Sequence, residues 1–583
     1  MSTSHLFVTR GDLTRLRADI VVIPTSTEAQ GTGKTISAAM QRWGVEAIND
    51  LLQRARPNLT DAAGSAAGSM LRGVREDDPR GVVLVATVQS QTDGAIVEQA
   101  ARNAIAEALR LLAAPEVAGR PRLGPKGPGE AFPARALIAI GALGTGEARG
   151  EQRRGLAAAQ VRGIRQALDD RNRHMVDVDV DVVLVAWDDD LWATFVEARD
   201  AAHPTELGDE EAEIVQAIRS DACVLFVGAG LSRGMGLPDW QELTTQMGRI
   251  GQPAGQSEEY PNIAEHYVQL HGAQAHHALI RDLFGGERWR SAPLSLAHYL
   301  LLQLPFRHVV TTNYDGLVEH ALDALRRPAR KVVRNDEVAQ AGTRGLTTVF
   351  KIHGDASDPE GLREVVLTRT EYDRFETRHR AKAALLQALL LNHHFLFVGY
   401  SLSDPNLNTI RGAVQAMLAG SQRKAWVTRF PEGTAQPDAA HPLTWMEQPS
   451  AWELWRMLDR IAARCVDLSR SYLADGRTSE GTSLREQLLA VGRSLHDEIL
   501  HGRVADHERS ALATTLAALE ALGWRPEEAG SRFLLWRRLA EDAADPLHRS
   551  EWWSNALACA RNEEEASAAR TGLLLARTTH DAG

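Results

Sequence analysis

The sequence predicts an α/β protein in which two successive α/β regions are followed by a helical C-terminal region. Short apolar runs alternate with Ala-rich helical stretches between Leu6 and about Trp192, and a second series of strand-like runs begins at Cys223. Such alternation is typical of layered folds built on a largely parallel sheet. From about Ala451 onward the chain is rich in Leu, Ala and Trp with helical spacing, which predicts packed helices.

The first region contains four expected strands and two expected helices. The strands are residues 20–23, 82–85, 136–140 and 182–185, and the helices are residues 96–112 and 153–168. Each strand is a short apolar run of the kind that a buried strand requires. Residues 119–133 are dense in Gly and Pro and continue neither pattern, so we expect a surface loop there.

A chain of 583 residues is expected to form two to four domains, because a single core rarely organises so many residues, and the patterns along this chain favour three. We place them at residues 1–200, 207–470 and 471–583, with the polar segment 203–210 as the first linker. The strands expected in the second domain are residues 223–227, 308–311, 347–352, 365–367, 395–398 and 425–427. No strand is expected after the loop at 431–442.

Composition excludes several classes of protein. No apolar run approaches the roughly 20 residues that cross a bilayer, and the first residues lack the features of a signal peptide, so the cytoplasm is the expected compartment. The three cysteines, Cys223, Cys465 and Cys559, form no CxxC pair, which argues against a disulfide framework or a cysteine zinc site. The net charge of -11 carries no basic block, so no strong nucleic-acid binding is expected.

A glycine turn follows the first strand of the second region. Residues 223–227 run into Gly228-Ala229-Gly230, and Gly236-Leu237-Pro238-Asp239-Trp240 precedes a helical stretch. Small residues let backbone amides approach a pyrophosphate closely. The spacing departs from GxGxxG, because Arg233 stands in the place of the third glycine. A tight connection without a ligand is therefore an equal alternative for this turn taken alone.

Three further polar motifs follow strand-like runs. They are Thr312-Asn313-Tyr314-Asp315, His353-Gly354-Asp355 and Gly399-Tyr400-Ser401-Leu402-Ser403-Asp404-Pro405. The carboxyl ends of parallel strands meet at one edge of a sheet, and open α/β sheets bind ligands at that edge. The sequence therefore predicts a ligand site where these motifs converge with the glycine turn.

Taken in this order, the motifs resemble the sirtuin-like (silent information regulator) family over residues 207–470. The variant is most similar to the bacterial branch found in antiviral defence proteins. In the protein-deacetylase branch the motif at Thr312 begins with Gln, and a four-cysteine zinc module supports the acyl-lysine groove. Both features are missing here. The resemblance implies a Rossmann-like parallel sheet and NAD+ as substrate, with no metal.

The resemblance also implies roles for individual residues. Asn313 would contact the nicotinamide ribose and orient water, and His353 would act as general base, since imidazole titrates near neutral pH. Asp315 would hold the nicotinamide end of the pocket, or cap the following helix, or both. The other residues implied to bind NAD+ are Gly228, Ala229, Gly230, Ser232, Asp239, Trp240, Thr312, Gly399 and Ser401. Trp240 is equally readable as a core anchor, and Lys351 as a phosphate contact or a solvated lysine at a strand end.

The implied reaction is departure of nicotinamide through an oxocarbenium-like transition state. Capture by water gives ADP-ribose, and capture by an internal nucleophile gives a cyclic isomer. The leading hypothesis is an NAD+ glycohydrolase that depletes NAD+ in antiphage defence. One alternative is an NAD-dependent protein deacylase or ADP-ribosyltransferase, and another is a non-catalytic regulator that binds NAD or ADP-ribose.

The first region is similar to a divergent macro domain. The resemblance rests on Gly11-Asp12-Leu13-Thr14, on residues 18–22, on the turn and helix at 31–40 and on the glycine-rich segment 141–146. It implies a second ligand site formed by Asp19, Gly31, Gly33 and Gly144, with a ligand-free scaffold as the alternative. A P-loop at residues 31–35 is disfavoured, because Glu28 stands where a Walker A motif needs Gly.

Partners are implied by resemblance alone. Sirtuin-like defence proteins often assemble, so a homo-oligomer is expected. A nucleotide-derived activator or a phage protein would serve as the trigger, and no membrane partner is expected.

Overall fold

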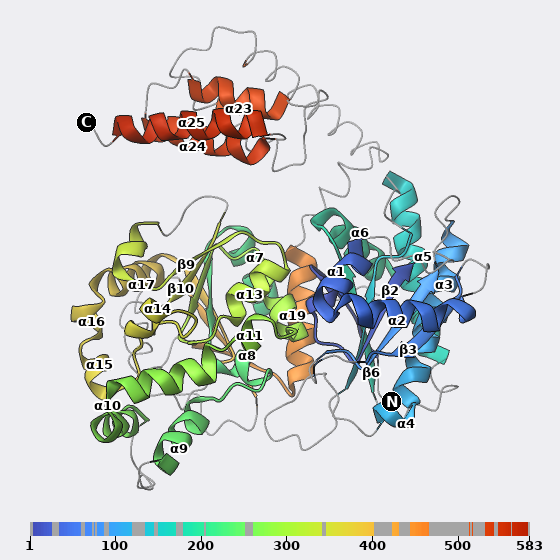
Figure 1. Ribbon diagram of the computed structural model, residues 1–583, viewed down its shortest axis with the longest axis horizontal. Coiled ribbons are helices and arrows are strands. Elements are labelled where there is room, and N and C mark those ends of the chain that lie inside the picture. Colours follow the sequence, from blue (N-terminus) through green and yellow to red (C-terminus); the bar gives the residue numbers. More distant parts are fainter. Residues whose placement is uncertain are drawn as a thin grey trace. The chain divides into compact units, whose positions relative to one another are not determined.

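A computed structural model gives the structure of the protein (Figure 1). It describes residues 4–25, 34–59, 64–72, 75, 78–86, 93–118, 135–144, 150–170, 179–202, 206–250, 260–340, 346–400, 423–430, 443–465, 499, 512–513, 516, 531–541, 546–560 and 563–580. The chain forms two compact units. One comprises Met1–Glu147 and Arg154–Val466, and the other comprises Ala148–Arg153 and Asp467–Gly583.

A six-stranded sheet organises the N-terminal part of the first unit, with the order β1-β6-β5-β2-β4-β3. Its strands are β1 (Leu6–Arg10), β2 (Ile20–Thr25), β3 (Ala66–Met70), β4 (Gly81–Ala86), β5 (Ala136–Gly141) and β6 (Val180–Ala186). Neighbouring strands are parallel except β3 and β4, which are antiparallel. The four predicted strands are confirmed.

Helices cover this sheet. They include α1 (Lys34–Trp43), α2 (Val45–Ala55), α3 (Gly94–Ala113), α5 (Gly150–Asp169) and α6 (Asp189–Ala202). The side chain of Asp93 accepts a hydrogen bond from the Ile96 N–H at 2.8 Å and so caps α3. The two predicted helices of this region are confirmed by α3 and α5. The loop predicted at 119–133 lies outside the described residues.

A second sheet follows, and the described residues give it seven strands in the order β13-β12-β11-β7-β8-β10-β9. They are β7 (Cys223–Val227), β8 (His308–Thr311), β9 (Ala329–Val332), β10 (Thr347–Lys351), β11 (His394–Val398), β12 (Ala425–Arg429) and β13 (Leu443–Glu447). All neighbours are parallel. The predicted Rossmann-like parallel sheet is confirmed. Strands β7 and β10 are buried throughout, as expected of strands that are covered on both faces.

Two strand predictions in this region are wrong. Residues 365–367 are buried, but they pair with no strand in the described part of the sheet and lie between α14 (Pro359–Arg363) and α15 (Arg369–Asp373). A strand does form after the 431–442 loop, namely β13. Its run Leu-Thr-Trp-Met-Glu is only partly buried, because it lies at the edge of the sheet.

The helix α19 (Ala451–Cys465) lies between the two sheets (Figure 1). Its buried Asp459 pairs with Arg199 of α6 at 2.6 Å and with His5, just before β1, at 2.9 Å. Burying these charges is tolerable because they compensate one another. The two sheets therefore share one compact unit, and the division into domains at residues 200–207 stays a prediction.

The second unit is helical where it is described. Helices α23 (Ser531–Glu541), α24 (Pro546–Cys559) and α25 (Glu563–His580) pack around an apolar cluster that includes Trp536, Trp552 and Trp553. The predicted helical C-terminal region and the packing role of these tryptophans are confirmed. None of the described helices is long and apolar enough to cross a membrane.

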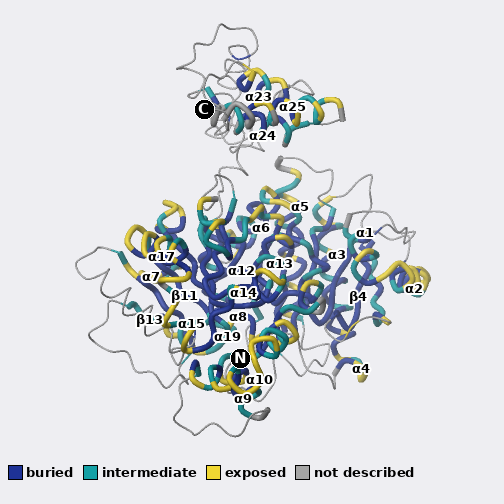
Figure 2. The backbone as a smooth tube through the Cα atoms, turned by 60° about the vertical axis from the view of Figure 1, so that its left-hand side comes forward, coloured by how far each residue is buried: buried dark blue, intermediate teal, exposed yellow. Residues whose placement is uncertain are grey.

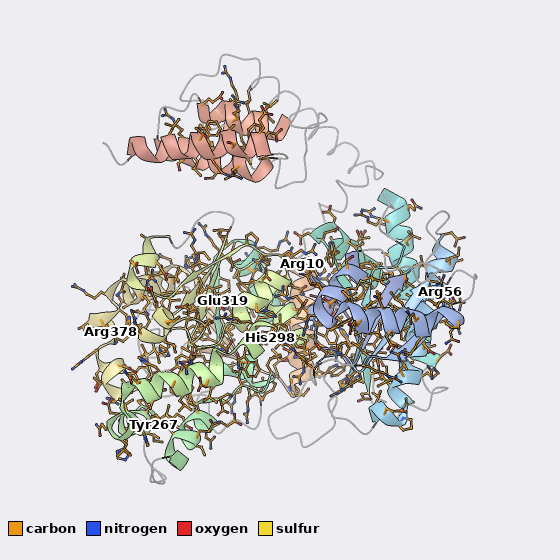
Figure 3. The ribbon with its side chains drawn as sticks, in the orientation of Figure 1. Arg10, Arg56, Tyr267, His298, Glu319 and Arg378 are labelled. Atoms are coloured by element: carbon orange, nitrogen blue, oxygen red, sulfur yellow. The ribbon has the colours of Figure 1, made fainter. Side chains whose placement is uncertain are left out.

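Burial is concentrated in the strands and in the inner faces of the helices (Figure 2). Many exposed residues lie on the outer faces of α2, α10 (Tyr260–Phe284) and α17 (Arg380–Asn392). Of the labelled side chains in Figure 3, His298 lies inside the first unit, whereas Arg56 and Arg378 are exposed at its periphery.

Candidate active site

Four adjacent parallel strands, β11, β7, β8 and β10, carry the predicted motifs directly after their carboxyl ends. Strands β8 and β10 pair with Thr311 opposite Lys351. Asn313 and His353 each lie two residues beyond that pair. The ladder continues past it, because the Ile352 N–H donates to the Thr311 carbonyl at 3.1 Å. The sheet thus brings the Thr312–Asp315 and His353–Asp355 turns to one edge.

The glycine turn after β7 packs backbone to backbone against Gly399. The Gly230 N–H donates to the Gly399 carbonyl at 2.7 Å. A Cβ atom on Gly228 would lie 2.6 Å from that same carbonyl oxygen, and Gly399 has a φ of 67°. Only glycine fits this contact, because any side chain would meet backbone atoms. Ser401 lies outside the described residues.

Asn313 is buried, and both its backbone and its side chain are held by hydrogen bonds. Its backbone N–H donates to Thr311 Oγ1 at 3.0 Å, and its side-chain Nδ2 donates to the Gly228 carbonyl at 3.2 Å and to Ser232 Oγ at 3.0 Å. The carbonyl oxygen Oδ1 has no hydrogen-bond partner among the described residues. A buried acceptor without a partner costs free energy unless a ligand or water supplies a donor.

A pocket lies in front of Asn313. Its lining residues are Ala229, Ser232, Pro238, Asp239, Trp240, Leu243, Phe284, Thr312, Asn313, Tyr314 and Asp315. Seven of these were predicted from the sequence, whereas Gly228, Gly230, Gly399 and His353 are not among them. Pro238 and Tyr314 belong to predicted motifs, so the motif pattern could have identified them. Leu243 and Phe284 carry no polar signal that would distinguish them from core residues.

Asp315 joins this pocket to a helix. Its carboxylate accepts from the Leu317 N–H at 3.0 Å, at the start of α13 (Leu317–Ala324), and bonds to the Ser232 hydroxyl. Burial raises the pKa of Asp315, and the nearby Lys351 charge opposes that rise. Both predicted positions of this residue, at a helix start and in the pocket lining, are therefore observed.

The loop before α9 (Trp240–Ile250) supplies Asp239 and Trp240. Asp239 Oδ1 accepts from the Glu242 N–H at 2.9 Å, and Glu242 Oε2 accepts from the Asp239 N–H at 3.1 Å, so the pair forms a capping box. Trp240 is partly buried, and its ring lies edge-on to Tyr314 at 6.2 Å. The capping box fixes the position of this wall of the pocket.

His353 is buried and neutral. Its ring packs edge-on against Tyr372 at 5.4 Å and Phe375 at 6.3 Å. Burial, and then the positive charge of Lys382 and the neighbouring His379, lower the pKa of His353 to about 3. Its Nδ1 has no hydrogen-bond partner among the described residues. A neutral imidazole can accept a proton, which is the form that a general base requires.

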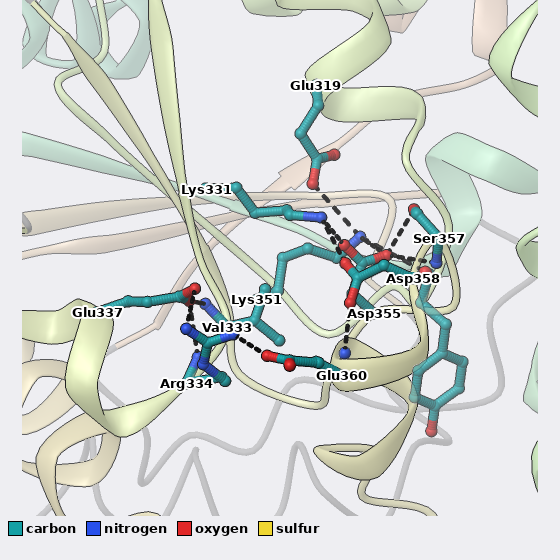
Figure 4. A network of polar contacts seen from close by, with 12 residues as sticks. Glu319, Lys331, Val333, Arg334, Glu337, Lys351, Asp355, Ser357, Asp358 and Glu360 are labelled. Carbon is teal, nitrogen blue, oxygen red and sulfur yellow. Dashed lines mark hydrogen bonds and ion pairs between the residues drawn. The ribbon is translucent and has the colours of Figure 1, made fainter.

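Lys351 differs from both interpretations of the sequence. It is fully buried rather than solvated, and its Nζ lies between the Tyr314 and Asp315 carbonyls and the carboxylates of Glu319 and Asp355 (Figure 4). An ammonium that is already surrounded by oxygen acceptors has no donor to spare for a phosphate. The lysine belongs to the protein interior.

The prediction that Asp19 and Gly144 share a second ligand site is wrong. Asp19 lies at the amino end of β2, is buried, and its Oδ2 accepts from the Leu137 N–H at 2.9 Å. Gly144 follows the carboxyl end of the parallel strand β5. The two residues therefore lie at opposite edges of the sheet and cannot share one ligand pocket. Gly31 and Gly33 lie outside the described residues.

The family model of the SIR2-like domain matches residues 307–449. Residues 307–449 are therefore similar to SIR2-like domains. The matched segment contains both the Asn313 and the His353 turns, whereas the glycine turn at Gly228 precedes it. In the described part of the chain, no cluster of three or more His, Cys, Asp or Glu side chains could hold a metal.

Curated relatives match the SIR2-like domain and its surroundings. The protein named NAD(+) hydrolase ThsA from Bacillus cereus (strain MSX-D12) is 28% identical over 213 residues, which are 36% of this chain and 44% of that protein. The protein of the same name from Enterococcus faecium is 31% identical over 214 residues, which are 36% and 43%. Defense-associated sirtuin 2 of Bacillus subtilis is 27% identical, over 37% and 22%. The chain thus spans less than half the length of these relatives.

Solved structures similar to this chain are macrodomains. The Oceanobacillus iheyensis macrodomain with MES bound covers 35% of this chain and 94% of its own length, at 17% identity and a TM-score of 0.26. The same macrodomain with ADP gives the same values.

Proposed function

We propose that this protein is an NAD+ glycohydrolase that cleaves NAD+ to nicotinamide and ADP-ribose. The observation that carries the proposal is the pocket at the carboxyl edge of the second sheet, where Asn313 presents a buried carbonyl oxygen that no described residue contacts with a hydrogen bond. The names of the NAD(+) hydrolase relatives support the same reaction.

The chemistry assigns a task to each residue. Asn313 Oδ1 would accept a hydrogen bond from a ribose hydroxyl or from the attacking water. His353, neutral because it is buried, would take up a proton from that hydroxyl or water. The apolar walls provided by Phe284 and Leu243 would exclude bulk water while one molecule is oriented, which is a large part of how such sites lower a barrier.

The test follows nicotinamide release from NAD+ by proton NMR with the purified full chain. Asn313→Ala and His353→Ala are each expected to lower kcat about 100- to 10,000-fold, the usual contribution of a positioned acid or base. The control is His393→Gln, a histidine just before the amino end of β11, at the opposite edge of the sheet. This variant should keep the activity of the unsubstituted chain.

Each alternative function has a distinct outcome in the same assay. Release that depends on an added acyl-peptide indicates a deacylase, and transfer to an acceptor protein indicates an ADP-ribosyltransferase. NAD+ binding without turnover, in the presence of every candidate trigger, indicates a regulator. A cyclic product instead of ADP-ribose leaves cleavage in place and changes only the nucleophile.

We further propose that the enzyme acts in the cytoplasm as a homo-oligomer and depletes NAD+ during phage infection. The name of the relative Defense-associated sirtuin 2 supports the defence role. A nucleotide-derived activator or a phage protein would provide the trigger. Light scattering on the purified chain tests the assembly, and NAD+ measurement in infected cells that carry the active or the His353→Ala protein tests the depletion.

A further inference from the structure

The ammonium of Lys351 lies where the two motif turns meet (Figure 4). It donates to the backbone carbonyl of Asp315 in a short contact and lies 3.5 Å from the carbonyl of Tyr314, both in the Thr312–Asp315 turn. On its other side it lies 3.3 Å from Asp355 Oδ1, in the turn that contains His353. One side chain therefore bridges both turns.

A charge in this position needs compensation. Lys351 and Asp355 are both fully buried, and an isolated buried charge is strongly destabilising. Burial lowers the pKa of Lys351, but the carboxylates of Glu319, Asp355 and Asp315 outweigh burial, so the pKa is raised and the side chain stays charged. The network is built to keep an ammonium here.

The same network fixes the His353 turn. Asp355 Oδ1 accepts from the Ser357 N–H at 2.9 Å and from its hydroxyl at 2.6 Å. The Ala356 N–H donates to the Tyr314 carbonyl at 2.8 Å. The two turns are thus joined by a backbone hydrogen bond and by the Lys351 bridge. The bridge contacts Asp315, two residues after Asn313, and Asp355, two residues after His353.

A second lysine provides a comparison. Lys331 of β9 also pairs with Asp355 in a short contact, and it lies 3.1 Å from Asp358. Both partners lie on the His353 side of the network. Lys331 is partly exposed, whereas Lys351 is not. The two lysines share one carboxylate but differ in whether they contact the Thr312–Asp315 turn.

We propose that Lys351 is a positioning residue of the NAD+-cleaving site, which clamps the Thr312–Asp315 turn to the His353 turn and so sets Asn313 against His353. This inference rests on the proposed function. Lys351 does not touch the substrate in this account. It acts through the two turns, and its loss should therefore affect the chemical step more than substrate binding.

The first experiment measures the clamp without reference to activity. Amide hydrogen exchange is followed by mass spectrometry in Lys351→Met and in the matched variant Lys331→Met, since Met keeps the length and apolar stem of Lys. Faster exchange in peptides covering residues 311–317 and 353–357 is expected for Lys351→Met but not for Lys331→Met. Equal exchange in both variants would overturn the clamp.

The second experiment separates kcat from KM. Lys351→Met is expected to lower kcat about 10- to 100-fold, because displacement of a catalytic group by about 1 Å can cost that much, while KM stays within about twofold. Lys331→Met should stay within about threefold in both constants. A change confined to KM, or the same kcat loss in both variants, contradicts the positioning role.

Folding is checked by thermal melting of each variant. If Lys351→Met does not fold, Lys351→Gln replaces it in both experiments, because its amide can still donate to a backbone carbonyl while the charge is removed. If the unsubstituted chain releases no nicotinamide even with every candidate trigger added, the proposed function fails, and the exchange comparison alone still decides whether Lys351 holds the turns together.

Discussion

A single hydroxyl connects two polar residues of the pocket, Asn313 and Asp315. Ser232 Oγ accepts from Asn313 Nδ2 at 3.0 Å and bonds to the carboxylate of Asp315. With Nδ2 engaged in this way, the Oδ1 end of the amide is left for a ligand. The orientation of Asn313 therefore depends on a residue of the glycine-turn segment, on a different strand connection.

Ser232→Ala should weaken this orientation without removing a proposed reacting group. Nδ2 would keep only its bond to Gly228, and a hydrogen bond of this kind contributes about 1 kcal/mol. We expect kcat to fall about tenfold, as measured by nicotinamide release. Ser220→Ala, at the end of α7 (Asp209–Arg219), serves as the control, and a loss as large there would contradict the assignment.

The pH dependence should report the charge beside His353. Lys382 lowers the pKa of His353, so Lys382→Met should raise it. A base must be neutral, and kcat/KM falls as the pH drops through its pKa. The acid limb of the profile should therefore move to higher pH in the variant. The measurement is kcat/KM between pH 3 and 9, a range that reaches the pKa of His353 at about 3.

The Lys382 substitution has an internal check at alkaline pH. Burial lowers the pKa of Lys382 itself to about 8. Lys382 is therefore charged throughout the acid limb, and above about pH 7 His353 is neutral in both proteins, so the two profiles should coincide there. Lys424→Met, which removes an exposed lysine paired with Glu213, controls for the loss of a cation. Superimposable acid limbs for the Lys382 variant and the unsubstituted chain would exclude this influence on His353.

At the scale of elements, one helix joins the pocket to the first sheet. Asp315 accepts from the Leu317 N–H at the amino end of α13, and the carbonyl of Ala324, at its last residue, accepts from the Asp12 N–H at 3.0 Å. Arg15 reaches Asp323 of the same helix at 2.6 Å. The Gly11-Asp12-Leu13-Thr14 turn, which the sequence marked as part of a macro-like region, therefore packs on the helix that begins at the pocket.

Gly11→Ala should be more destabilising than Gly44→Ala. Both glycines have positive φ, at 126° and 96°, so both substitutions strain the backbone at a cost of about 1–3 kcal/mol. Only at Gly11 would the new Cβ also meet the Ala324 carbonyl oxygen, at 2.9 Å, since nothing lies within 4 Å of the Gly44 position. Melting temperatures of the two variants measure the difference, and equal losses would contradict the close contact.

Sequence patterns predicted the central strands well and the sheet edges poorly. Strand β7 reads Cys-Val-Leu-Phe-Val and is buried throughout, so its apolar run is unambiguous. The edge strand β9 reads Ala-Arg-Lys-Val, and its charged side chains hide it from an apolar pattern. Residues 365–367 were wrongly predicted as a strand. They are apolar and buried, but a buried apolar run forms a strand only where it has a hydrogen-bonding partner strand.

The same reasoning separates what the sequence could predict of the site. Motifs at strand ends predicted the pocket residues Asn313 and Asp315, because parallel topology forces those ends together. The sequence pattern could not predict the burial of Lys351, because the partners of this lysine, Glu319 and Asp355, come from different elements. Nor could the motifs predict the environment of Asp19, whose carboxylate accepts a hydrogen bond from a backbone amide of the neighbouring strand.

At the scale of the whole molecule, buried histidines make the first unit sensitive to acid. Burial lowers the pKa of both His298 and His353 to about 3, and that of His308 and His320 to about 4. In the unfolded chain a histidine titrates near 6.5. Between these values the unfolded state binds more protons, so stability is complete above about pH 6.5 and is lost progressively as the pH falls toward 4.

His298→Gln should isolate one of these contributions. His298 is fully buried, with Nδ1 at 2.7 Å from Ser295 Oγ, so the variant should melt at a lower temperature at pH 7.5 because of lost packing. The difference in melting temperature should narrow as the pH drops to 4.5. In the unsubstituted chain His298 stays neutral when folded but takes up a proton when unfolded, which lowers the stability of that protein alone. Each unit of pH in that interval changes the difference by about 1.4 kcal/mol for one fully shifted group. Asp315 and Glu319, whose pKa values are raised by burial, act in the opposite direction, but they are present in both proteins and cancel from the comparison. Calorimetric scans of both proteins across this pH range measure the gap, the exposed His271→Gln controls for loss of a histidine, and a gap that stays constant with pH would show that His298 does not stay neutral in the folded state.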